Sequence, residues 1–220
     1  MHHGGASFRL NDNATLAATI LYVDYGQIDG YDVDGASIGN LEANDLAASL
    51  SLGHRFGEYF SAGITGKYIG QRLDDMTASA FAADLGVRAD FGTIAIGATM
   101  ANVGTKIKFE QIEETLPRTA RAGLAVRLMD ESLLLATEYE HQFFGNSVIH
   151  NGAEFNLDQR YFIRAGFFTS PEADSYIGSG LTFGAGALIS GLKLDYAYSG
   201  SENLGSADLH RFSLSYFLQR

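Results

Sequence analysis

Some residues of this chain have types and spacings that could bind an ion. Asp29, Asp32 and Asp34 suggest a calcium loop, because closely spaced carboxylates can surround Ca²⁺. The EF-hand spacing fails, since Gly30 stands in the place of the first ligand and Leu41 in that of the closing glutamate. A solvated acidic turn therefore explains these aspartates better than a metal site does.

Other candidates for chemistry also fail on spacing or context. Gly63–Lys67 has the wrong glycine spacing for a phosphate-binding loop, and Tyr68 replaces the required Ser or Thr. No serine has a nucleophile-elbow context, and the absence of cysteine excludes thiolate metal sites, disulfides and thiol catalysis. The dispersed histidines fit interfacial positions at strand ends better than a metal site; they are His54, His141, His150 and His210. We expect no enzymatic activity, no cofactor and no metal.

The elements that would position side chains are best seen in Ile177–Ser199. Its first half alternates glycine and threonine with large apolar residues, and after Ser190-Gly191 the alternation resumes in a new phase. Lys193 and Asp195 then share one face, while leucines and tyrosines occupy the other. Successive strand residues point to opposite faces, so this pattern predicts a hairpin with lipid on one side and a polar interior on the other.

The same alternation recurs along the whole chain and predicts an all-β fold, an antiparallel transmembrane β-barrel of about 12–14 strands. Short turns alternate with longer loops, as expected for periplasmic turns and extracellular loops. Nearly all mid-strand charges share the glycine-rich face, which we expect to face the lumen. These charges are Arg55, Lys67, Asp84, Arg88, Arg121, Arg127, Glu138, Glu140, Glu154, Arg164, Lys193, Asp195 and Arg211.

Composition supports this prediction without excluding every rival. Gly is abundant at 26 residues against 2 Pro, and no apolar run reaches the ~18 residues of a membrane-spanning helix. The net charge of −11 argues against nucleic-acid binding. A soluble all-β protein remains an alternative, because periodicity permits the two faces to be exchanged.

The chain is expected to form one barrel domain, 1–220, that lacks its N-terminal part. Met1–Gly5 has neither the basic start nor the apolar core of a secretory signal. Twelve strands follow a stub at Ala6–Leu10, and bacterial barrels use even numbers, so completing the stub and adding one strand would give fourteen.

Several short motifs occur in a fixed order along the chain. They include Tyr22–Gly26, Gly66–Ile69, Asn102-Val103-Gly104 followed by Leu116-Pro117, Leu194–Tyr198 and His210–Leu214. With this ordered set the chain resembles the PorV/PorQ family of outer-membrane proteins. The resemblance implies a FadL-like barrel in the bacterial outer membrane and a role in type IX secretion. The N-terminal segment that packs in the lumen of such proteins is missing here.

This resemblance makes a secretion platform the main functional hypothesis. The extracellular loops Gln27–Asn44 and Thr105–Pro117 would engage secretion-system proteins or cargo, with Asp29, Tyr31, Asp32 and Asp34 as possible partner-binding residues. The alternative is a FadL-like channel that takes up hydrophobic small molecules, and a soluble binding protein is third. Outer-membrane lipid would surround either barrel.

Overall fold

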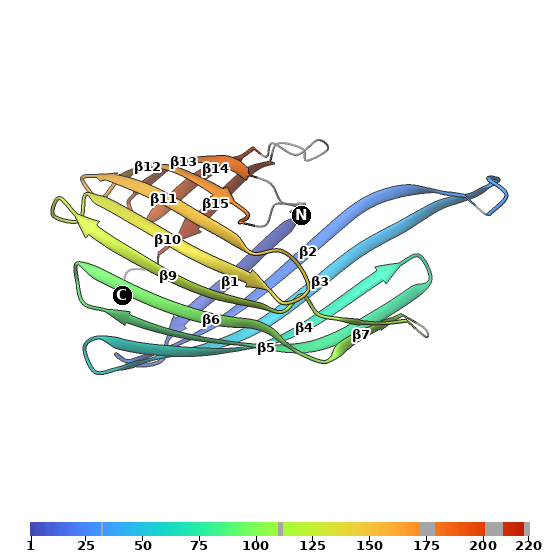
Figure 1. Ribbon diagram of the computed structural model, residues 1–220, viewed down its shortest axis with the longest axis horizontal. Helices are drawn as coiled ribbons and strands as arrows, with labels where there is room; N and C mark the ends of the chain where they lie inside the picture. Colours follow the sequence, from blue (N-terminus) through green and yellow to red (C-terminus); the bar gives the residue numbers. More distant parts are fainter. Residues whose placement is uncertain (32, 110–111, 172–178, 201–208, 218–220) are drawn as a thin grey trace. The chain divides into compact units, whose positions relative to one another are not determined.

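Antiparallel β-strands make up the fold of the chain (Figure 1). The computed structural model describes residues 1–220 except positions 32, 110–111, 172–178, 201–208 and 218–220. Within the described residues, thirteen strands form one sheet in chain order, and β7 and β8 form a separate pair. No helix there is long and apolar enough to cross a membrane. The predicted twelve strands and stub correspond to the thirteen strands of the sheet.

The chain divides into two compact units, of which the first comprises Met1–Val87 and Thr99–Arg118. Its strands are β1 (His2–Arg9), β2 (Ala14–Tyr31), β3 (Ser37–Phe56), β4 (Phe60–Leu73), most of β5 (Met76–Asp90) and the end of β6 (Ile94–Gly104). The stub is longer than predicted, because β1 pairs with β2 from His2↔Tyr22 onward. The Asn11 side chain accepts the N–H groups of Asn13 and Ala14, both at 2.9 Å, and so closes the turn between these strands.

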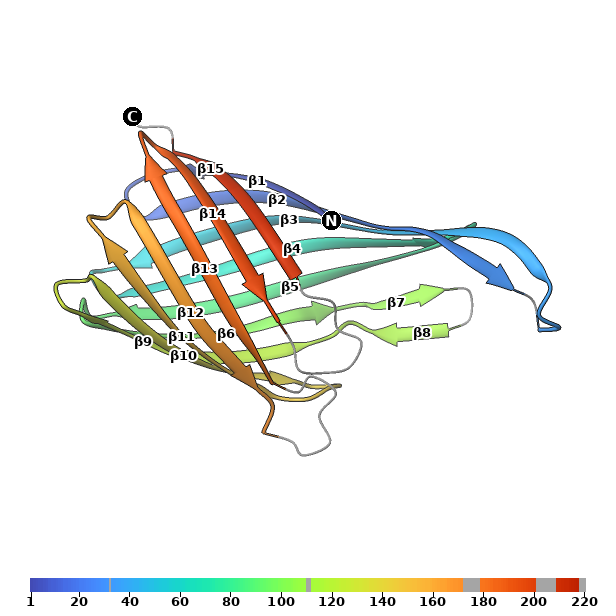
Figure 2. The same ribbon diagram turned by 90° about the horizontal axis from the view of Figure 1, so that it is seen from above.

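The second unit, Arg88–Ala98 and Thr119–Arg220, contains a regular meander of strands that lie side by side in chain order (Figure 2). Asp158 and Gln159 have positive φ angles of 53° and 55°, and Ser190 and Gly191 have 52° and 83°. Such left-handed residue pairs match the twist of adjoining strands in two-residue hairpin turns. The strands are β9 (Thr119–Leu128), β10 (Leu133–Gln142), β11 (Val148–Leu157), β12 (Tyr161–Thr169), β13 (Ser179–Ile189), β14 (Leu192–Ser199) and β15 (Leu209–Tyr216). The expected hairpin is therefore β13–β14, and its first positions, 177–178, lie outside the described residues.

The prediction of a long loop at Gln27–Asn44 is wrong, because β2 and β3 continue as a paired hairpin from Gln27↔Glu42 to Tyr31↔Ser37. Pairing of β3 with β4 ends at Ala43, and pairing of β1 with β2 ends at Tyr22. The described residues of segment 27–42 therefore form a two-stranded ribbon with a connecting turn, which runs beyond β1 and β4 in Figure 1. We call this segment the β2–β3 extension. It contains four acidic residues and no basic one.

The prediction of a loop at Thr105–Pro117 also needs correction. This segment holds a second hairpin, β7 (Lys106–Phe109) paired with β8 (Ile112–Thr115), which is visible in Figure 2. Ile107 and Leu116 are buried against the small side chains of Ala78, Ala80 and Ala82 on β5. These apolar contacts explain why the segment is ordered where the sequence suggested a loop.

Candidate functional site

The two faces of the strands differ in a way that decides what surrounds the protein. Large apolar side chains stand exposed on one face; Leu50 is 56%, Phe81 63% and Ile163 66% exposed. Among the described residues no large side chain is fully buried, and the buried apolar residues are mostly alanines. A soluble sandwich would bury its apolar face in a core. Side chains of this kind in such number need a hydrocarbon environment instead.

The opposite face carries the predicted charges, and Arg164 of β12 forms ion pairs there with β11, its neighbour, and with β14, the second strand on its other side. Its Nε donates to Glu154 Oε2 on β11 at 2.6 Å, and its Nη1 to Asp195 Oδ1 on β14 at 2.7 Å. Lys193 Nζ lies 3.6 Å from Asp195 Oδ2. The reach to Asp195 crosses β13 at Gly186, where an added Cβ would lie 2.4 Å from Asp195 Oδ1. The glycine series of β13 thus leaves room for this ion pair.

A second charged group lies on β9, β10 and β11. Arg121 Nε is 2.7 Å from Glu140 Oε2 and 3.8 Å from Glu138 Oε1, and His150 Nε2 is 3.9 Å from Glu140 Oε2. One ligand atom each from Glu138, Glu140 and His150 lie within 4.8 Å of one another, close enough to hold a divalent cation. Arg121 already forms an ion pair with Glu140, so these side chains form an ion-pair cluster without a bound cation.

A third charged group of the second unit lies at the turn between β5 and β6. Arg127 Nη1 and Nη2 bond the two carboxylate oxygens of Asp90, both at 2.9 Å, and Nη1 also donates to the Gly92 carbonyl. Arg88 pairs with the same Asp90. Arg55 and Arg211 have exposed side chains, and neither forms an ion pair with any residue that the structure describes.

In the first unit, Lys67 of β4 and Asp84 of β5 form an ion pair of 2.7 Å. Asn102 of β6 completes this group: its backbone N–H donates to Asp84 Oδ1 at 2.8 Å, its Oδ1 accepts from Lys67, and its Nδ2 donates to the Pro117 carbonyl at 2.8 Å. Asn102 has a φ of 60°, which asparagine tolerates better than most residues. The sequence alone did not mark Asn102 as a site residue; the available signal was an asparagine two residues before a glycine inside a strand.

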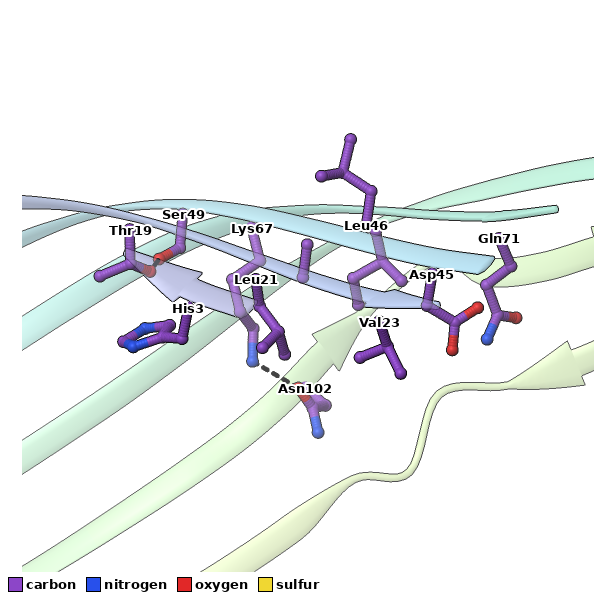
Figure 3. A pocket seen from close by; sticks show the side chains of 12 residues that line it. His3, Thr19, Leu21, Val23, Asp45, Leu46, Ser49, Lys67, Gln71 and Asn102 are labelled. Atoms are coloured by element: carbon purple, nitrogen blue, oxygen red, sulfur yellow. Dashed lines mark hydrogen bonds between the residues drawn. The ribbon is translucent and has the colours of Figure 1, made fainter. Parts of the chain in front are cut away.

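Lys67 and Asn102 of this group line a pocket of about 390 Å³, whose other lining residues come from β1–β4 (Figure 3). Lys67 and Asn102 are joined across it by the hydrogen bond drawn in Figure 3. The lining mixes aliphatic side chains with a few polar groups, the usual composition of a small-molecule site. The lining residues are His3, Thr19, Leu21, Val23, Asp45, Leu46, Ala47, Ser49, Lys67, Ile69, Gln71 and Asn102. Of these, only Lys67 was predicted from the sequence as a site residue.

The four possible partner-binding residues belong to the β2–β3 extension. Asp29 pairs with Asn40 across the hairpin, Tyr31 ends β2, Asp34 lies in the connecting turn, and Asp32 is outside the described residues. The side chain of Asn40 donates to Gln27 Oε1 at 2.9 Å. The structure therefore places Asp29 and Tyr31 on a paired ribbon and Asp34 in its turn.

The base of the extension is fixed by a tyrosine–aspartate contact. Tyr25 Oη donates to Asp45 Oδ2 at 2.9 Å, and this hydrogen bond, with burial and the negative charge of Asp45, raises the pKa of the Tyr25 phenol. A spanning strand needs about 9–11 residues, so Tyr25 lies past the spanning part of β2.

Comparisons with known proteins identify the fold. No family model matches the chain, and no curated protein matches it. Among solved structures, the chain is similar to the Ralstonia pickettii toluene transporter TbuX, with a TM-score of 0.72, 14% identity and coverage of 98% of this chain and 81% of that one. The P. putida toluene transporter TodX gives 0.70 and 12%, over 97% and 79%. A Pseudomonas aeruginosa FadL homologue gives 0.61 and 11%, over 90% and 68%.

The fold is that of the FadL-like outer-membrane β-barrels. The predicted all-β transmembrane barrel is confirmed at this level. Identities of 14% and below show the fold alone. The narrower likeness to PorV/PorQ proteins is not shown by these structures.

Proposed function

We propose that the protein is a non-enzymatic outer-membrane β-barrel channel for hydrophobic small molecules, with the charged face lining its lumen and outer-membrane lipid around its apolar face. The whole chain would form one membrane domain. The pocket carries this proposal, because Leu21, Val23, Ala47 and Ile69 give it an aliphatic wall within an otherwise polar face. Apolar solutes gain free energy from such a surface in proportion to the area removed from water.

Similarity to TbuX and TodX, both described as toluene transporters, supports a neutral aromatic hydrocarbon as the first probe. The pocket volume of about 390 Å³ falls within the range of small-ligand sites. The charged groups beside it are paired with one another, so they add little attraction for ionic solutes.

Adjacent alanines of β3 provide a matched test. Ala47 lines the pocket, whereas Ala48 pairs with Ile20 and Tyr68, whose side chains stand on the exposed apolar face. In lipid nanodiscs, Ala47→Trp should weaken toluene binding at least about tenfold by filling the pocket, and Ala48→Trp should leave it unchanged. Equal binding by both variants would contradict the pocket as the site.

A secretion platform of PorV/PorQ type, as in type IX secretion, is the second candidate. The observation that favours it is the β2–β3 extension, a ribbon beyond the sheet with four acidic residues and no basic one. An isolated two-stranded ribbon is marginally stable, so contact with a partner would stabilise it. Deleting residues 27–42 should abolish co-purification of secretion proteins or cargo; retention of toluene binding by the same variant would separate the two roles.

A further inference from the structure

The charge pairing at the pocket suggests how it discriminates between ligands. Among the residues that the structure describes, Lys67 is the one lysine or arginine that lines it, and its side chain is 18% exposed. Its amino group lies 2.7 Å from Asp84 Oδ1 and also donates to Asn102 Oδ1. Asp84, which does not itself line the pocket, thus neutralises the positive charge of Lys67 next to the aliphatic wall.

Asp84 is held in this position by more than the lysine. The Asn102 backbone N–H donates to Asp84 Oδ1 at 2.8 Å, and the Asn102 side chain is tied to the Pro117 carbonyl at 2.8 Å. The carboxylate therefore stays beside Lys67 when a ligand approaches. Asp45, a second carboxylate in the lining, adds negative charge and is bonded to Tyr25.

These contacts have opposite consequences for two ligands of the same hydrocarbon length. A neutral molecule meets an aliphatic wall and a compensated ion pair. An amphiphilic carboxylate would need a free cation for its head group, and Lys67 in the described lining is already paired with Asp84. Like-charge repulsion from Asp84 and Asp45 adds to the cost of desolvating its carboxylate.

We propose that Asp84 is the residue that determines charge specificity: by compensating Lys67 it makes the pocket accept neutral apolar molecules and reject amphiphilic carboxylates. This inference rests on the proposed function of the pocket. Removing the charge of Asp84 would leave Lys67 directed at the pocket and create a site for a carboxylate with an aliphatic tail.

The test compares 1-octanol and octanoate as ligands of the full chain in nanodiscs, by calorimetric titration near neutral pH. Wild-type protein should bind octanol at least about tenfold more tightly than octanoate. Asp84→Asn should tighten octanoate binding by at least about tenfold with octanol binding retained. The double variant D84N/K67M should lose that gain. Asp45→Asn is the matched control, because it removes a lining carboxylate that does not pair with Lys67. The gain in octanoate affinity should be clearly smaller in this variant than in Asp84→Asn.

Each contrary outcome has a distinct meaning. Octanol binding by Asp84→Asn without tighter octanoate binding would overturn the specificity role, as would an equal gain in Asp45→Asn. Failure of wild-type protein to bind either ligand would instead refute the proposed function. Asp84→Ser, whose hydroxyl can still accept the Asn102 N–H, guards against a folding defect in Asp84→Asn. Loss of octanol binding in both variants would make Asp84 structural and overturn the proposal.

Discussion

Replacing Leu50 with arginine tests whether the exposed apolar face meets lipid. Leu50 is 56% exposed near the middle of the part of β3 that pairs on both sides, and its register partners are the small residues Ala18 and Gly66. No carboxylate is directly opposite to compensate an arginine. An arginine on the lipid face near the bilayer midplane costs about 2–4 kcal/mol, equivalent to a roughly 30- to 700-fold change in the folding equilibrium. At an exposed position of a soluble protein, the same substitution would change the free energy of unfolding by at most about 0.5 kcal/mol.

The assay is equilibrium unfolding by guanidinium in lipid vesicles, with Val33→Arg as the control. Val33 is fully exposed in the turn of the β2–β3 extension, outside any spanning segment, so the same arginine should cost less than about 0.5 kcal/mol there. Equal, small costs at both positions would refute the membrane orientation of the strands and favour the soluble alternative.

Two further predictions follow from individual contacts. Gly186→Ala should lower the free energy of unfolding by about 1–2 kcal/mol in the vesicle assay, because the new Cβ would lie 2.4 Å from Asp195 Oδ1 and disturb its hydrogen bond with Arg164. Gly66→Ala is the control and should be nearly neutral, because the space around its Cβ is open. Equal effects of the two substitutions would contradict the role of the glycine face. The pKa of Tyr25 is raised, so its hydrogen bond to Asp45 persists through pH 10 and is lost only as the pH rises past the shifted value. An ultraviolet difference titration of wild type against Tyr25→Phe should therefore give a midpoint above 10, and Asp45→Asn should lower this midpoint.

The strands of the sheet could be predicted because each has one apolar and one polar face, a pattern that the sequence displays directly. The hairpin β13–β14 illustrates this: Phe183 and Leu194 are exposed, while Thr182 and Asp195 lie on the other face. The partners of the charges could not be predicted, because they depend on register. On β13, Gly184 is the register partner of Arg164 and Gly186 that of Asp195. Arg164 can reach Asp195 because these two glycines place no side chain between them.

The two predicted loops failed for different physical reasons. The β2–β3 extension is polar and rich in glycine and aspartate, which is typical of a loop, but backbone pairing such as Gly30↔Gly39 requires no apolar alternation when both faces meet solvent. The β7–β8 segment did contain a signal in Ile107 and Leu116. Their burial against the alanines of β5 depends on contacts between distant parts of the chain, which spacing alone does not reveal.

The proposed channel function is tested most directly by native mass spectrometry of the protein extracted from its own membranes in mild detergent, with bound small molecules, lipids and proteins all identified. We expect a barrel that retains an apolar, uncharged small molecule and loses it when Ala47→Trp fills the pocket. Stoichiometric recovery of secretion-system subunits or cargo, with no small molecule bound, would contradict it and favour the platform.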